Sequence, residues 1–406
     1  MKNEKIKIAL HWQILIAIIL GIGFGYFLTE HVGYVDWLGA VFMRLLRMIV
    51  VPLIFCSVAG GVATISATDG FLRLGGKTFG YYVFTCLIAI ITGLFFVNLI
   101  KPGQGIQIVL PETDAIAQTV QMSLRDFLIN IVPDNVFQAF AHMNMVGIII
   151  FAMLFGVFLG KSTHPGAQKV QLAINGIGDA ILNLTLLILK LAPIGIFGLI
   201  AGVVAAEAGT PDKLRQLLES QGIYAFTVLL GISVHTFITL SVLLFVAARI
   251  NPFEHLHRMR DVLLMAFSTA SSSGTLPLTL AHVKERCGVP EKIANFALPV
   301  GATVNMNGTS LYECVAVIFI AQVYGMDLSL SQQAFVVFAS VLVGIGAAGI
   351  PMGSLVMTVM IIQIVGLPPE SIGLILLVDR FLDMARTTLN VYADTVCTVI
   401  VAKSEK

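Results

Sequence analysis

Apolar runs of about twenty residues recur along the whole chain, and they constrain its fold more than any other feature. A helix of about twenty apolar residues crosses a bilayer core roughly 30 Å thick and satisfies its own backbone polar groups. Of the 406 residues, 57% are hydrophobic and only 12% are charged, whereas about a quarter are charged in a typical soluble domain. Such a chain cannot cover a water-facing surface, so we predict an all-α polytopic membrane protein.

Turns and charges divide these runs into predicted helical spans. The continuous spans are 9–29, 37–67, 79–100, 144–160, 176–204 and 223–249. The stretch 120–143 is less apolar, and we interpret it as an interfacial or broken helix. The N-terminal run resembles a signal peptide but lacks a small-residue cleavage site, so we interpret it as the first helix.

Two further apolar segments, near 258–290 and 331–367, are interrupted at their middles by Ser, Gly and Pro. We interpret both as hairpins that enter and leave on one side of the membrane, each followed by a long helix, as in an internal repeat. The termini and loops on that side then hold fifteen of the twenty-four Lys and Arg residues, against four in the opposite loops. The positive-inside rule therefore favours cytoplasmic termini in the cell (inner) membrane.

Composition also excludes several classes of function. A net charge of +1 offers no basic surface for nucleic acid, so we expect no nucleic-acid partner. The five cysteines stand singly in or beside apolar segments, without metal-ligand spacing. We find no nucleophile-and-base or metal-ligand pattern, and we therefore do not expect an enzyme.

The last long apolar segment carries its polar residues on one face. At 100° per residue, a stripe about 100° wide holds Asp379, Asp383, Arg386, Thr387, Asn390 and Asp394. A charged side chain at mid-membrane costs about 2.5–3.5 kcal/mol on insertion scales. An internal ion pair that locks two helices would explain the charges but not Thr387 and Asn390, so we interpret the stripe as a binding surface.

The first broken segment contains TASSSGTLP, from Thr269 to Pro277, near its middle. Hydroxyl residues followed by Gly and Pro allow two half-helices to meet with free backbone N–H groups facing an anion. An α-carboxylate would suit this tip, although a small-residue packing face is the alternative.

The next helix contains GATVNMNGT, from Gly301 to Thr309. Two Asn and two Gly are poor helix formers, so we predict an unwound segment whose free carbonyls suit sodium, the alternative being a kink without function. Four residues beyond Thr309, Glu313 is an intramembrane carboxyl. Because burial favours its neutral form, it is a candidate proton carrier.

The second broken segment bends at GIGAAGIPMGS, from Gly344 to Ser354. This density of glycine supplies mobility and exposed backbone, so we expect a gate that is ordered over a bound substrate.

With SSSGTLP, NMNGT, AGIP and DMARTTLN in this order, the chain resembles the glutamate transporter family, the dicarboxylate/amino acid:cation symporters. The resemblance implies eight transmembrane helices, two re-entrant helical hairpins, a homotrimer in the lipid bilayer and an elevator mechanism. It implies a scaffold domain at 1–78, with a peripheral first helix, and 120–222. The moving transport domain would comprise 79–119 and 223–406.

The resemblance also implies roles for individual residues. Asp383 would hold the substrate ammonium and Arg386 its side-chain carboxylate. The other implied substrate-binding residues are Ser271, Ser272, Ser273, Thr309, Gly349, Ile350, Ser354, Thr387 and Asn390. The implied ligands of one sodium ion are Gly301, Asn305, Asn390 and Asp394. Those of a second are Thr303, Gly344, Ile345 and Ala347. Those of a third are Tyr82, Thr85, Cys86, Asn305 and Asn307.

Three features depart from the family pattern. Asn307 replaces a sodium-coordinating Asp, and Cys86 replaces a hydroxyl residue at the same site. Ala270 and Met384 stand at the two positions where family members carry a further Arg. We therefore expect one or two coupled sodium ions, with the third site weak, or a proton carried by Glu313.

The leading hypothesis is secondary active transport of glutamate or aspartate, with C4-dicarboxylate transport on the same fold as the alternative. Asp383 favours an amino acid, because a carboxylate partners an ammonium and repels a dicarboxylate. A neutral amino acid would leave Arg386 buried and unpaired. An anion channel is the alternative of another class, and the polar broken hairpins favour occlusion instead.

Overall fold

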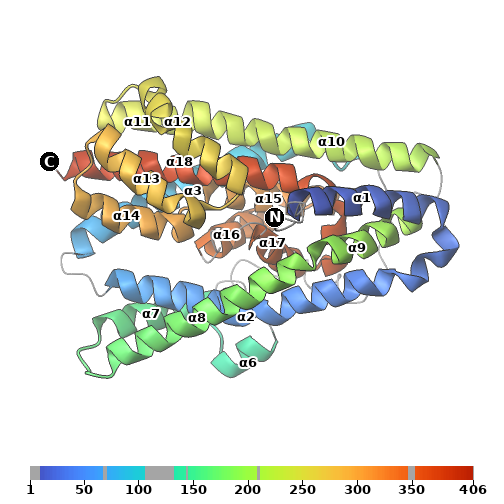
Figure 1. Cartoon of the computed structure of the whole chain (residues 1–406), viewed down its shortest axis with the longest axis horizontal. Helices are drawn as coiled ribbons and strands as arrows, with labels where there is room; N and C mark the ends of the chain where they lie inside the picture. The colour runs from blue at the N-terminus through green and yellow to red at the C-terminus, as the bar shows by residue number, and fades with distance from the viewer. Residues whose placement is uncertain are drawn as a thin grey trace, which may run out of the picture.

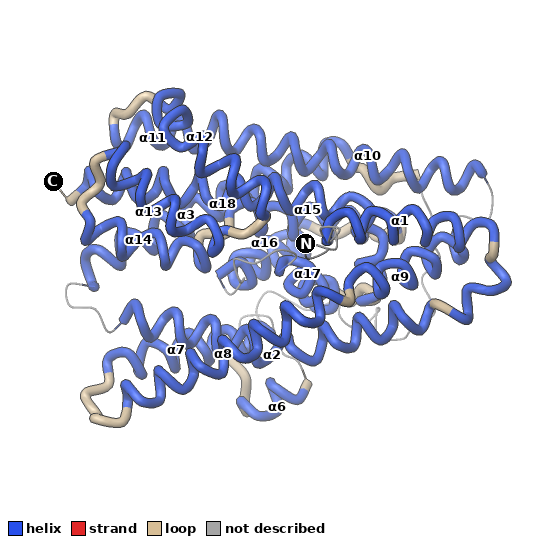
Figure 2. The backbone as a smooth tube through the Cα atoms, in the orientation of Figure 1, coloured by secondary structure: helices blue, strands red, loops and turns tan. Residues whose placement is uncertain are grey.

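The computed structural model describes residues 10–66, 71–105, 132–142, 145–207, 211–345 and 353–405. In these ranges every regular element is a helix and none is a strand, which confirms the all-α prediction. Within the same ranges, five helical stretches are long and apolar enough to cross a membrane: Asp36–Thr64, Leu74–Ile100, Ala167–Lys190, Leu214–Ala248 and Glu291–Val323. Many of the helices run along the long axis of the molecule (Figures 1 and 2).

One group of helices packs around α2. It comprises α1 (Leu10–Phe27), η1 (Thr29–Tyr34), α2 (Asp36–Ser66), α6 (Val136–Ala141), α7 (Met145–Lys161), α8 (Ala167–Lys190) and α9 (Ala192–Glu207). Helix α2 packs against α7, α8 and α9, and α1 packs against α9 (Figure 1). Glycines permit close approach, since a Cβ on Gly25 of α1 would lie 2.5 Å from the Ala201 carbonyl of α9.

A second group of helices surrounds α18. It comprises α3 (Phe71–Ile100), α10 (Pro211–Val234), the π-helical turn η2 (His235–Thr239), α11 (Leu240–Ala248), α12 (Pro252–Thr269), α13 (Ser272–Cys287), α14 (Glu291–Val304), α15 (Asn307–Val323), α16 (Leu330–Ile345), α17 (Gly353–Ile364), η3 (Pro369–Leu374) and α18 (Leu376–Ser404). Helix α18 contacts α3 and each helix from α10 to α15. Helix α15 lies in the core, because every side chain from Asn307 to Ala321 is buried.

Several predicted boundaries are wrong. The single span 176–204 is two helices, because Pro193 stands in the first turn of α9 and cannot continue the hydrogen-bond ladder of α8. Helix α3 begins eight residues before 79, and α10 begins at Pro211 rather than 223. In α10, Pro211 and Asp212 make a favourable helix start that hydropathy alone does not detect.

The predicted breaks in the C-terminal part are present. Helices α12 and α13 meet at Ala270, whose φ of 49° is left-handed, and at Ser271, which caps α13. Helix α14 ends at Val304 and α15 begins at Asn307, which confirms the unwound segment. The expected gate, Gly344 to Ser354, spans the end of α16 and the start of α17, and its middle, 346–352, lies outside the described residues.

Candidate functional site

A buried charged cluster lies where α15 crosses α18. Arg386 is 1% exposed, and its Nη2 donates to Asp379 Oδ1 at 3.1 Å and to Asp383 Oδ1 at 3.0 Å. Tyr312 of α15 donates its hydroxyl to Asp379 at 2.7 Å, and the Arg386 guanidinium lies 3.7 Å from the centre of the Tyr312 ring. Three residues on two helices therefore fix the direction of one guanidinium.

Only one of the three guanidinium nitrogens of Arg386, Nη2, donates a hydrogen bond within the described residues. Its Nε and Nη1 have no hydrogen-bond partner among the described residues. A buried donor without a partner costs about 1–3 kcal/mol, and more when it is charged. A site that keeps such donors can repay this cost by binding a carboxylate.

The unwound segment between α14 and α15 is attached to α18 by Asn390. Its Oδ1 accepts from the backbone N–H of Gly308 at 2.7 Å, and its Nδ2 donates to Thr309 Oγ1 at 3.0 Å. The two backbones touch here, because a Cβ on Gly308 would lie 2.6 Å from the Arg386 carbonyl. Glycine is therefore required at 308, and Thr309 comes to lie beside the Arg386 cluster.

The serines of the first hairpin take different positions. Ser271 accepts from the N–H of Gly274 at 3.0 Å and so begins α13. Ser272 is buried and donates to the Ala302 carbonyl of α14 at 3.2 Å, whereas Ser273 is exposed. The hairpin tip is thus attached through Ser272 to the helix that leads into the unwound segment.

Other expected substrate contacts are only partly described. Thr387 and Ser354 are buried, and Ser354 Oγ has no partner among the described residues. Gly349 and Ile350 lie outside the described residues.

A second polar cluster lies further along α18. Asn305 donates to Asp394 Oδ1 at 2.9 Å, and Thr85 of α3 lies 3.3 Å from Asn305 Oδ1. A Cβ on Gly301 would lie 2.5 Å from Asp394 Oδ1 and 2.9 Å from the Tyr82 hydroxyl. The described residues place no Lys, Arg or His in ion-pair contact with Asp394. Asp394, Asn305, Thr85 and Tyr82 thus bring carboxylate, amide and hydroxyl oxygens close to the Gly301 backbone, and oxygen ligands of these kinds suit a small hard cation.

The structure describes only part of the second expected sodium site. Thr303 donates to its own helix at the Val300 carbonyl, and Gly344 lies against the Ser310 hydroxyl. Ile345 ends α16, and Ala347 lies outside the described residues.

The amide of Asn307 faces a histidine. Its Nδ2 lies 3.3 Å from His235 Nε2, and its Oδ1 has no partner in the described part of the chain. His235 begins the π-helical turn η2, a feature frequent at functional sites. Cys86, the other departure at the third site, is buried.

Glu313 lies deep in α15. It is 0% exposed, and neither carboxyl oxygen has a hydrogen-bond partner among the described residues. A carboxylate in this position would be unsolvated and unpaired, so the geometry favours the proton-bearing carboxyl.

Sequence reasoning found the polar stripe of α18 but missed several partners. Tyr312 stands in an apolar stretch with no local signal, and Asp379 was placed on the stripe without a role. His235 and Arg380 likewise have no local pattern around them that indicates a role. Each is recognised by a contact between residues distant in sequence or by its orientation on the helix.

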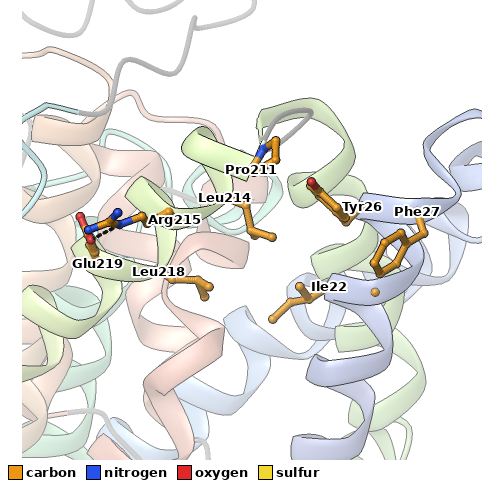
Figure 3. Close-up of a pocket in the computed structure, with 9 residues that line it drawn as sticks. Ile22, Tyr26, Phe27, Pro211, Leu214, Arg215, Leu218 and Glu219 are labelled. Atoms are coloured by element: carbon orange, nitrogen blue, oxygen red, sulfur yellow. Dashed lines mark hydrogen bonds and ion pairs between the residues drawn. The ribbon is translucent and has the colours of Figure 1, made fainter.

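A separate pocket of about 550 Å³ lies between α1 and α10. Figure 3 shows Ile22 and Phe27 on one side and Leu214 and Leu218 on the other, with the Arg215–Glu219 ion pair beyond them. None of the expected site residues lines this pocket, so it is not the polar site on α18.

Comparison with known proteins identifies a family and several similar transport proteins. The chain matches the family described as the sodium:dicarboxylate symporter family over residues 10–404. It is 34% identical to the proton/sodium-glutamate symport protein of Bacillus caldotenax, over 98% of this chain and 95% of that one. It is also 34% identical to the proton/glutamate-aspartate symporter of Escherichia coli (strain K12), over 100% and 94%. Excitatory amino acid transporter 3 of Mus musculus is 33% identical, over 98% and 86%.

Proposed function

The chain belongs to the sodium:dicarboxylate symporter family, and from this premise we propose that it carries glutamate or aspartate across a membrane together with cations. It is a transporter and not an enzyme, and the relatives named above are also transporters. The observation that carries the choice of substrate is Arg386, a buried guanidinium with unused donors next to Asp383.

Each end of an acidic amino acid has a complementary group. The side-chain carboxylate would bind Arg386 through Nε and Nη1, and the ammonium would bind Asp383. The α-carboxylate would bind near Thr309 and Asn390, with the tip at Ser272 beside them. A C4-dicarboxylate lacks the ammonium, so Asp383 favours the amino acid.

Coupling would use the cluster around Asp394. Sodium would be held by Asp394 and Asn305, with the Gly301 backbone, Thr85 and Tyr82 beside it. The pair Asn307–His235 offers no carboxylate, so a third sodium would be weak. Glu313 is the alternative carrier, as a carboxyl that moves a proton with the substrate.

The two groups of helices suggest how movement occurs. The group around α18 contains all the expected binding residues that the structure describes, and we propose that it moves as a transport domain against the group around α2 in an elevator mechanism. Exposed apolar side chains of α8, such as Leu172 and Leu187, would face lipid or the other subunits of a homotrimer. The charge distribution supports cytoplasmic termini in the cell (inner) membrane.

Uptake of radiolabelled aspartate into proteoliposomes, with sodium and proton gradients imposed separately, tests this proposal. Arg386→Cys should abolish uptake of acidic amino acids, whereas Arg215→Cys, at an exposed arginine of α10, should leave it intact. Unchanged aspartate affinity in Arg386→Cys would refute the substrate assignment.

The same vesicles identify the coupling ion. A sodium dependence with a slope near three would contradict the weak third site. Affinity indifferent to sodium, with uptake driven by a proton gradient and lost in Glu313→Gln, would establish proton coupling instead.

A further inference from the structure

A second arginine contacts the carboxylate of Asp383. Arg380 lies three residues earlier on α18, and its Nη1 is 3.3 Å from Asp383 Oδ2. Arg386 holds the other oxygen, Oδ1, at 3.0 Å. Each oxygen of Asp383 therefore faces a guanidinium.

The charges of this cluster balance without any substrate. Asp379 and Asp383 carry two negative charges, and Arg380 and Arg386 carry two positive ones. Without Arg380 the cluster would have a net charge of −1, and an ammonium would restore neutrality. Arg380 thus takes the electrostatic place of a substrate ammonium at Asp383.

The two arginines differ in how firmly they are held. The Arg386 side chain is 1% exposed and has three partners, Asp379, Asp383 and the Tyr312 ring. The Arg380 side chain is 16% exposed, and its one ion pair among the described residues, at 3.3 Å, is longer than the 3.0 and 3.1 Å pairs of Arg386. Its Nε has no partner among those residues. Arg380 is therefore the guanidinium that can leave Asp383.

We propose that Arg380 is a specificity-determining residue, a built-in cation that occupies the Asp383 oxygen available to a substrate ammonium. It sets how strongly the site distinguishes an amino acid from a dicarboxylate without an amine. This inference rests on the proposed function, since it takes Asp383 as the ammonium ligand.

The consequence has opposite signs for the two kinds of ligand. An amino acid must displace Arg380 before its ammonium can use Oδ2, so Arg380 weakens its binding. A dicarboxylate needs Arg380 in place, because the guanidinium offsets the repulsion between Asp383 and the ligand. Removing Arg380 should therefore move the two affinities apart.

The experiment measures the dissociation constants of aspartate and succinate on purified protein at saturating sodium, for the native chain, Arg380→Ala and Arg380→Lys. In Arg380→Ala the ratio of the succinate constant to the aspartate constant should rise roughly tenfold or more, the scale of one charge-assisted contact. Arg380→Lys keeps the charge and should keep most of the native ratio. Arg215→Ala, at an exposed arginine of α10, is the control and should not change it.

The outcomes separate this inference from the proposed function. An unchanged ratio in Arg380→Ala, or equal losses for both ligands, would show a structural ion pair and overturn the inference. A native protein that binds neither ligand, or an Arg386→Cys variant that still binds aspartate, would overturn the proposed function instead.

Discussion

Gly301→Ala tests the proposed cation site, because Gly301 packs directly against the Asp394 carboxylate and leaves no room for a methyl group. The added methyl would lie 2.5 Å from Asp394 Oδ1, 2.8 Å from its Cγ and 2.9 Å from the Tyr82 hydroxyl. The Asp394 carboxylate must then move by about 0.5–1 Å to reach an ordinary contact distance. A shift of this size displaces an oxygen ligand of the proposed cation.

The expected cost follows from the packing. Forcing a methyl group into a filled site costs about 1–3 kcal/mol, which corresponds to roughly a 5- to 150-fold change in an equilibrium constant. The half-saturating sodium concentration for aspartate binding should rise by that factor. Calorimetry of aspartate binding at a series of sodium concentrations measures it directly. At saturating sodium the aspartate affinity should recover, because the Arg386 cluster is unchanged.

Gly80→Ala is the matched control. Gly80 lies on α3 near Tyr82, and a Cβ there would meet no atom within 4 Å. This variant should keep the native sodium dependence. If Gly301→Ala also kept it while remaining folded, the assignment of the cation to Asp394 and Asn305 would be wrong.

Two further variants test neighbouring parts of the site. Asn307→Asp adds a carboxylate beside His235, so the sodium dependence of aspartate binding should become steeper; a slope equal to the native one would contradict a weak third site at this position. Gly308→Ala places a Cβ 2.6 Å from the Arg386 carbonyl and should lower the free energy of unfolding by about 1–3 kcal/mol. Thermal denaturation in detergent measures this loss, with Gly222→Ala as the control because a Cβ there meets no atom within 4 Å. An equal loss in both variants would refute the close approach at Gly308.

The polar stripe of α18 could be predicted because it depends only on helical geometry. Residues three, four and seven apart share a face, so the spacing of Asp383, Arg386 and Asn390 placed them together before any fold was known. The same holds for the breaks at Ala270–Ser271 and at Asn305, since local residue types decide where a helix weakens. Hydropathy likewise determined an all-helical membrane protein.

The partners of those residues were decided by tertiary packing. Tyr312 meets Asp379 across 67 positions of the sequence, and His235 meets Asn307 across 72. Neither pair has a local signal, because an aromatic or a histidine in an apolar helix reads as core until the helix opposite it is known. The helix starts at Phe71 and Pro211 were also misplaced, since helices α3 and α10 extend beyond the apolar run that marks them. The sequence thus determines which residues share a helix face. Which side chains of α15 contact the charged residues of α18 is decided only by the crossing of the two helices, because contact between helices depends on packing across the whole fold.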